Sequence, residues 1–105
     1  IICLHLSYST ELYHLIDKIM LQYCTKSPVI INTSRGQLID EVALINALDK
    51  KFISGAALDV YEKEPYNGPL CKREDVLLTP HIASFTKEVR EKIEIEAVNN
   101  LVDNL

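Results

Sequence analysis

Four short apolar runs set the strongest constraint on the fold, because each of them is followed directly by polar or charged residues. The runs are Ile1–Leu6, Val29–Ile31, Phe52–Val60 and Val76–Leu78. They are continuously apolar for most of their length rather than alternating, which is the pattern of parallel strands buried on both faces. In a parallel sheet the carboxyl ends of the strands meet at one edge, so we expect the residues that follow these runs to lie together.

The segments between the runs predict helices. Apolar residues recur at steps of three and four from Leu12 to Tyr23, although Asp17 offers a second cap that could divide this helix into two short pieces. We expect His14, on this helix, to be a surface residue. The order β-α-β-α-β-β-α then predicts an α/β fold with a mainly parallel sheet and helices on both faces.

Two further helices have clear capping signals. Asp40 is suited to cap a helix from Glu41 to about Lys50. A long terminal helix is expected after Ser84 or Thr86, and the segment from Lys63 to Asp75 is expected to be an irregular surface loop.

Composition excludes several classes of protein. The 105 residues are 48% hydrophobic with a net charge of -4, which fits one globular domain. No apolar run approaches the ~20 residues of a membrane span, and the basic residues are too scattered to bind nucleic acid. Cys3, Cys24 and Cys71 are an odd number without metal-ligand spacing, so we expect no disulfide framework, no metal and a cytoplasmic location.

Arg35, Glu64 and His81 each follow a different apolar run and form one candidate catalytic set. An arginine can grip a carboxylate with two hydrogen bonds, and a histidine beside an acid can exchange a proton near neutral pH. Taken singly, each residue would more often be a solvated charge or a histidine satisfied by the backbone. Their joint order after successive strands favours a site for a small hydroxy or oxo acid.

Three segments carry a family resemblance. Ile31–Gly36, Ala56–Pro65 and Leu77–Ile82 closely resemble successive signatures of the D-isomer-specific 2-hydroxyacid dehydrogenases. The resemblance implies NAD as cofactor and identifies residues 1–105 as the carboxyl-terminal half of a dinucleotide-binding, Rossmann-like domain. With only three glycines, the chain lacks a G-x-G-x-x-G turn, so we expect the glycine-rich half, and also the substrate domain, to be absent from it.

The resemblance also implies roles for individual residues. Arg35 matches the arginine that binds the substrate carboxylate, His81 the acid/base, and Glu64 the carboxylate that pairs with the histidine. Asp59 matches the acid that faces the nicotinamide carboxamide, but it could instead cap its loop through its own side chain. The full set of residues expected to line the cofactor is His5, Leu6, Ser7, Thr33, Ser34, Arg35, Asp59, His81, Ala83 and Ser84. Ser7 and Ala83 depart from the proline and glycine that many relatives have there.

The expected function is hydride transfer between nicotinamide and a small D-2-hydroxy acid, carried out by a longer parent protein. The motifs are most similar to those of the phosphoglycerate dehydrogenases, which implies 3-phosphoglycerate as substrate and a role in serine biosynthesis, whereas the choice between NAD and NADP stays open. Two alternatives remain: an NADH-sensing module of corepressor type, and an inactive structural fragment that self-associates. The free edge of the first strand predicts a dimer or another homo-oligomer.

Overall fold

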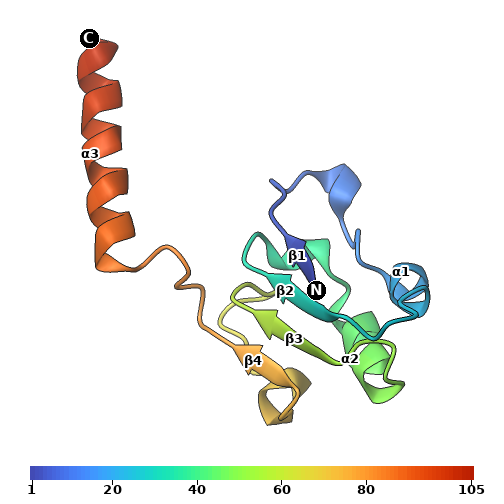
Figure 1. Ribbon diagram of the computed structural model, residues 1–105. Helices are drawn as coiled ribbons and strands as arrows, with labels where there is room; N and C mark the ends of the chain where they lie inside the picture. The colour runs from blue at the N-terminus through green and yellow to red at the C-terminus, as the bar shows by residue number, and fades with distance from the viewer.

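The computed structural model describes residues 1–105 and contains one four-stranded sheet (Figure 1). Its strands are β1 (Ile2–Leu4), β2 (Val29–Asn32), β3 (Gly55–Leu58) and β4 (Val76–Leu78). They lie in the order β1-β2-β3-β4, and every neighbouring pair is parallel. The predicted parallel α/β fold is therefore confirmed, and all four strands end at the same edge of the sheet.

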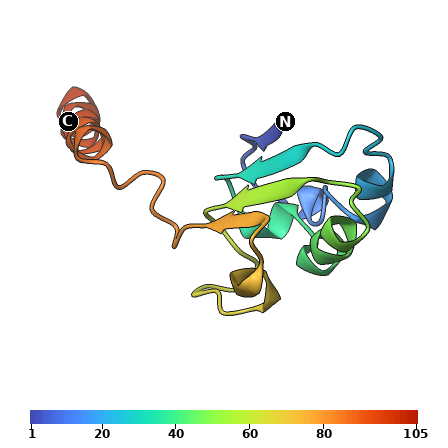
Figure 2. The ribbon, with the colours of Figure 1, turned by 60° about the horizontal axis from the view of Figure 1, so that its bottom comes forward.

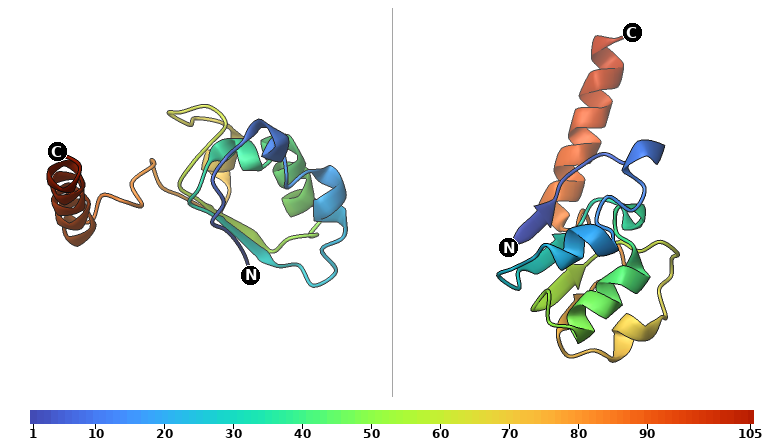
Figure 3. Two further views of the ribbon diagram at one scale, coloured as in Figure 1. Left: turned by 90° about the horizontal axis from the view of Figure 1, so that it is seen from above. Right: turned by 90° about the vertical axis from the view of Figure 1, so that its right-hand side faces the viewer.

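The helices that pack against the sheet lie on one of its faces. Helices α1 (Lys18–Gln22) and α2 (Glu41–Asp49) contact each other and cover the same side (Figure 3). On the opposite face, the paired row Cys3, Ile31, Ala57 and Leu77 carries no helix, and Leu77 is 66% exposed. Helices on both faces were expected, and within this chain the second face is open.

The hydrophobic core lies between α2 and the covered face of the sheet. Leu44 and Leu48 of α2 are fully buried against Ile30, as the helical spacing predicts. Each such side chain contributes about 1.5–3 kcal/mol by leaving water. The Asp40 carboxylate accepts a hydrogen bond from the Ala43 amide at 2.9 Å, which confirms it as the cap of α2.

The segment from Leu12 to Tyr23 does not form one long helix. A 3-10 turn, η1 (Thr10–Leu12), is followed by His14 in a left-handed conformation with φ of 55°. The chain then starts again at Asp17, whose side chain accepts the Met20 amide hydrogen bond at 2.8 Å and caps α1. The continuous helix was therefore wrong, and the alternative division at Asp17 is confirmed; Ile19, Met20 and Tyr23 are exposed.

Two strands are shorter than their apolar runs. Strand β1 stops at Leu4, and β3 begins only at Gly55, after bends at Phe52–Ser54. The irregular loop before β4 contains the 3-10 turn η3 (Pro69–Lys72), which buries Leu70 in the core. Arg73 donates paired hydrogen bonds to Asp75 within this loop, at 2.8 and 2.9 Å, and holds the loop to α2 through a hydrogen bond to Asp49 at 2.6 Å.

Helix α3 (Lys87–Asp103) extends away from the sheet (Figure 2). Thr86 caps it, as one of the two expected positions, by accepting the Val89 amide hydrogen bond at 3.3 Å. None of its residues is buried, and its apolar positions are exposed. No helix of the chain combines the length and apolar composition needed to cross a lipid bilayer.

Gly36 joins the loops after β2 and β3 by direct backbone contact. It opens the 3-10 turn η2 (Gly36–Leu38), and a Cβ atom at this position would overlap the Tyr61 carbonyl group and crowd the Glu62 nitrogen. The two loops can approach this closely only because residue 36 has no side chain.

We therefore expect Gly36→Ala to lower the free energy of unfolding by about 1–3 kcal/mol, because two backbone segments must separate. Gly68→Ala is the matched control, since an added Cβ there meets only the movable ring of Tyr66. Urea unfolding of both variants provides the comparison. Equal losses of stability would contradict the proposed constraint at Gly36.

Candidate functional site

The loop that presents Arg35 is built by Asn32, the last residue of β2. Asn32 is 1% exposed; its Oδ1 accepts the Ser34 amide hydrogen bond at 3.0 Å and its Nδ2 donates to the Arg35 carbonyl at 2.9 Å. A buried asparagine that satisfies the backbone in this way fixes the turn at the end of the strand. In the sequence, the only sign of this turn is that the polar residue Asn32 ends the β-branched run Val29–Ile31.

The ends of β1 and β2 enclose a hollow of about 490 Å³. The Ser34 hydroxyl donates to the Leu4 carbonyl at 2.6 Å and ties the two segments together. The residues that line the hollow are His5, Leu6, Ser7, Tyr8, Thr33, Ser34 and Arg35. Six of these seven are residues for which the sequence predicts cofactor contact, so two segments far apart in the chain meet as expected.

Arg35 is exposed and forms no ion pair within the chain. Its Nη1 donates a single hydrogen bond, at 2.6 Å, to the carbonyl of Ser34. Most donors of the guanidinium therefore remain available to an anion at the hollow.

His81 and Glu64 form the pair that the sequence predicts. His81 Nδ1 lies 2.8 Å from Glu64 Oε2, and the side chains are 47% and 37% exposed. The other oxygen of Glu64 accepts the Tyr61 amide hydrogen bond at 3.2 Å. The hydrogen bond from His81 outweighs the effect of burial and holds the pKa of Glu64 below its usual range. An ionised carboxylate at Nδ1 leaves Nε2 as the ring nitrogen that can exchange a proton with a ligand.

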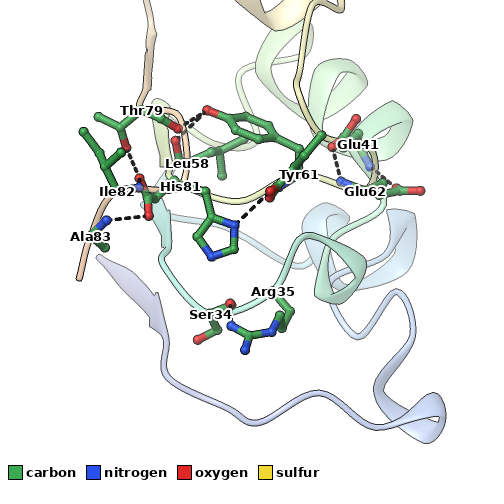
Figure 4. Close-up of polar contacts among 12 residues, drawn as sticks. Ser34, Arg35, Glu41, Leu58, Tyr61, Glu62, Thr79, His81, Ile82 and Ala83 are labelled. Atoms are coloured by element: carbon green, nitrogen blue, oxygen red, sulfur yellow. Dashed lines mark hydrogen bonds and ion pairs between the residues drawn. The ribbon is translucent and has the colours of Figure 1, made fainter. Parts of the chain in front are cut away.

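His81 and Arg35 face the same space at the edge of the sheet (Figure 4). The imidazole points toward the side of the loop that bears the guanidinium, and no hydrogen bond joins the two. The structure thus brings the three residues of the candidate set, including Glu64, to one rim of the molecule.

Asp59 lies beneath the His81 loop rather than in the hollow. It is 4% exposed, and its carboxylate accepts hydrogen bonds from the Thr79 hydroxyl at 2.5 Å and from the amides of Ile82 and Ala83 at 2.9 Å each (Figure 4). Burial acts to raise the pKa of Asp59, but these three hydrogen bonds together hold it below its usual range. The geometry corresponds to the second of the two roles expected for Asp59, the capping of a loop.

The loop held by Asp59 gives His81 an unusual backbone. His81 has φ of 56°, in the left-handed region that most residues with a side chain avoid. Such a conformation persists when the surroundings determine it, and it is found most often at functional sites. Ala83 is exposed and contributes its amide to Asp59, whereas Ser84 is exposed and makes no hydrogen bond of its own.

Sequence reasoning missed a second histidine pair. His14 Nε2 lies 3.0 Å from Glu62 Oε1, and the two side chains are 25% and 30% exposed. His14 was expected to be a surface residue of a helix, but it lies outside any helix and is half-buried, because the left-handed turn at His14 directs the chain toward the loop after β3. No local pattern signals a contact between residues 48 positions apart.

Another hollow lies on the side of the loop that bears Glu64. It measures about 540 Å³ and is lined by the stacked rings of Tyr61 and Tyr66, together with Glu64, Pro65, Cys71, Leu78, Thr79 and Pro80. Neither Arg35 nor His81 lines it. No group of three or more His, Cys, Asp and Glu side chains is placed to hold a metal ion.

Comparison with known proteins identifies the family. Residues 1–83 match the D-isomer specific 2-hydroxyacid dehydrogenase, NAD binding domain, family. The chain is 44% identical over 104 residues to a glyoxylate reductase of Thermofilum pendens, covering 97% of this chain and 31% of that protein. The chain belongs to this family, and the predicted resemblance is confirmed.

Solved structures support the same assignment. A glyoxylate reductase from Paecilomyes thermophila superposes with a TM-score of 0.87 at 38% identity, covering 94% of this chain and 30% of that one. A phosphoglycerate dehydrogenase from Lactobacillus plantarum superposes with a TM-score of 0.79 at 38% identity, covering 85% and 29%. The chain spans about a third of the length of the relatives it matches.

The hollow between β1 and β2 fits the cofactor of this family. It lies beyond the carboxyl ends of parallel strands, where α/β domains bind nucleotides, and it offers the hydroxyls of Ser7 and Thr33 beside the Arg35 guanidinium. These groups suit the polar amide and ribose parts of a nicotinamide nucleotide.

The ionisation of Asp59 generates a prediction about pH. Because the pKa of this carboxyl is lowered in the folded chain, its hydrogen bonds contribute stability fully above the ordinary aspartate value of about 3.9 and lose it as the pH falls through the lowered value. The amide ¹⁵N shifts of Ile82 and Ala83 should therefore stay constant from pH 7 to about 4 and change below it.

Asp59→Asn should abolish this titration, because an amide side chain has no carboxyl group to protonate. Asp17→Asn is the control, since asparagine caps a helix as well as aspartate does. A titration of Ile82 and Ala83 that survives in Asp59→Asn would contradict the assignment.

Proposed function

We propose that this chain is the carboxyl-terminal half of the dinucleotide-binding domain of a longer, NAD-dependent enzyme. The enzyme interconverts a small D-2-hydroxy acid and its 2-oxo acid. The observation that carries the proposal is the His81–Glu64 pair at 2.8 Å, which shares one rim with the unpaired guanidinium of Arg35 in a chain of this family.

Arg35 binds and orients the acid. Its free donors can hold a carboxylate with two parallel hydrogen bonds, and the positive charge polarises the neighbouring 2-oxo group. NADH, when bound, supplies the hydride that C2 receives. The residues proposed to hold it beside the substrate are those of the 490 Å³ hollow, with Ala83 and Ser84 on the adjoining loop.

His81 moves the proton. In the reductive direction Nε2 gives a proton to the oxo oxygen, so the product carries one added hydride at C2 and one added proton at oxygen. In the oxidative direction the ring takes that proton back. Glu64, which is ionised at neutral pH, stabilises the imidazolium form and holds the ring in orientation. Asp59 acts through the loop, by holding His81 in position, rather than by contact with the cofactor.

Glyoxylate and related unphosphorylated oxo acids are the substrates that the relatives' names favour. The expected substrate, 3-phosphoglycerate, is the second candidate, because a phosphoglycerate dehydrogenase is among the similar structures. Arg35 is the only Lys or Arg among the residues that line the hollow. It can bind the carboxylate of the acid, but the hollow has no second basic side chain of this chain to bind a phosphate group, which favours an unphosphorylated substrate.

Three wider expectations belong to the same proposal. The free thiols of Cys3, Cys24 and Cys71 support a cytoplasmic enzyme. A homo-oligomer is the second expectation, and it does not rest on the edge of β1, which belongs to the rest of the sheet in the longer protein. A module that only senses NADH has no use for a histidine paired with an acid at the rim, so the pair favours catalysis over sensing.

His81→Asn tests the proton transfer in the full-length protein. Asparagine tolerates the left-handed backbone at this position, so the loop is kept and only the imidazole is lost. We expect kcat for glyoxylate reduction to fall by roughly 10²- to 10⁴-fold, while NADH still binds, as measured by its fluorescence. Glu88→Gln, at an exposed site on α3, is the control. Undiminished turnover by His81→Asn would rule out the assigned role.

Arg35→Lys tests the carboxylate grip. Lysine keeps the charge but cannot form two parallel hydrogen bonds, so KM for the oxo acid should rise by about tenfold or more. Arg90→Lys, on the exposed helix α3, is the matched control. Steady-state kinetics with glyoxylate, hydroxypyruvate and phosphohydroxypyruvate decide the substrate at the same time. An unchanged KM for all three acids would show that Arg35 does not bind them.

A further inference from the structure

The loop that carries Glu64 is held at a second point by a histidine that the proposed reaction does not use. Glu62 and Glu64 stand two residues apart on the loop Tyr61–Pro65 that follows β3. Glu64 faces His81, whereas Glu62 faces His14, with 3.0 Å between His14 Nε2 and Glu62 Oε1.

Glu62 is also joined to the start of α2 by a reciprocal pair of hydrogen bonds. The Glu62 amide donates to Glu41 Oε1 at 2.8 Å, and the Glu41 amide donates to Glu62 Oε1 at 3.2 Å (Figure 4). Gly36 packs against the same Tyr61–Glu62 peptide. The Tyr61–Glu62 peptide is thus fixed from two sides. The Glu62 carboxylate is contacted both by the Glu41 amide at the start of α2 and by His14.

His14 is the only basic side chain in this cluster. Three acids face it: Glu62, Asp40, whose Oδ2 lies 3.8 Å from His14 Nδ1, and Glu41, whose pKa is raised by burial. The ring stacks on Tyr13 with 3.8 Å between centroids, and the His14 amide donates to the Gln37 carbonyl at 2.8 Å. Without the imidazole, three neighbouring carboxylates would face one another with only backbone amides as donors, which favours their separation.

The contact reaches Glu64 through the backbone. Glu64 Oε1 accepts the hydrogen bond of the Tyr61 amide at 3.2 Å, so the orientation of this carboxylate depends on the peptide segment that Glu62 anchors. The other oxygen, Oε2, is the one that lies 2.8 Å from His81.

We propose that His14 is a positioning residue for the reaction: by holding Glu62, it fixes the Tyr61–Pro65 loop and so orients Glu64 against His81. The inference rests on the proposed function for its catalytic consequence. Its structural part, that His14 holds the loop, can be measured separately.

The experiment compares His14→Ala, His14→Gln and the control Glu11→Gln in the full-length protein. Glutamine keeps a donor for Glu62, and Glu11 is an exposed acid of the same segment with no ion pair. Hydrogen exchange at the amides of Tyr61 and Glu62 reports the loop, and kcat and KM for glyoxylate reduction, measured across pH, report the reaction.

In His14→Ala we expect faster exchange at both amides and a fall in kcat of about tenfold to a hundredfold, because a displaced Glu64 no longer orients the ring. KM for NADH should change less than twofold, and the pH above which reduction declines should move down, since the imidazolium loses its partner. A purely structural role would not shift the pH profile. His14→Gln should restore most of the rate.

Two results would overturn the inference: unchanged exchange in His14→Ala, or faster exchange with an unchanged kcat and pH profile. If His14→Ala does not fold, Glu62→Gln replaces it, because this variant keeps the acceptor and removes only the charge that His14 holds. If the full-length protein reduces no 2-oxo acid, the proposed function fails, and the exchange data still decide whether His14 holds the loop.

Discussion

A buried carboxylate is the interaction on which the rest of the site depends. Asp59 is almost without contact with water, and three donors from the segment after β4 satisfy it. An ionised acid in such a position is costly to leave unpaired, so the segment cannot move away without a large penalty. His81 lies inside that segment in a left-handed conformation. The position of His81 at the rim is therefore fixed by the hydrogen bonds that its neighbours donate to the Asp59 carboxylate.

The parallel sheet and the shared edge could be predicted from the sequence because both follow from local patterns. Apolar runs identify parallel strands, and Arg35, Glu64 and His81 each follow such a run. The roles of Asp59 and His14 could not be settled in this way, since each depends on partners at least 20 residues away that only the folded chain brings close. The continuous helix expected from Leu12 to Tyr23 is divided at Asp17, the cap that the sequence offered as an alternative, whereas no local pattern signals the left-handed turn at His14.

The strands also explain one mismatch between expectation and structure. Their continuous apolar composition predicts burial on both faces, and α1 and α2 cover only one of them. The row Cys3, Ile31, Ala57 and Leu77 keeps the composition of an interior while lying at the surface. Composition therefore described the sheet correctly but gave no information on how much of it this chain covers.

The contact at Gly36 fixes the distance between the loop after β2 and the loop after β3. Arg35 directly precedes Gly36, and the Tyr61–Glu62 peptide that Gly36 touches leads to Glu64. Main chain therefore meets main chain between the residue proposed to bind the acid and the residue proposed to pair with the proton donor. The distance between the two loops is set by this main-chain contact, whereas the orientation of the Glu64 side chain also depends on its neighbours. Substitutions of side chains around the rim would therefore leave the distance between these two loops unchanged as long as residue 36 is glycine.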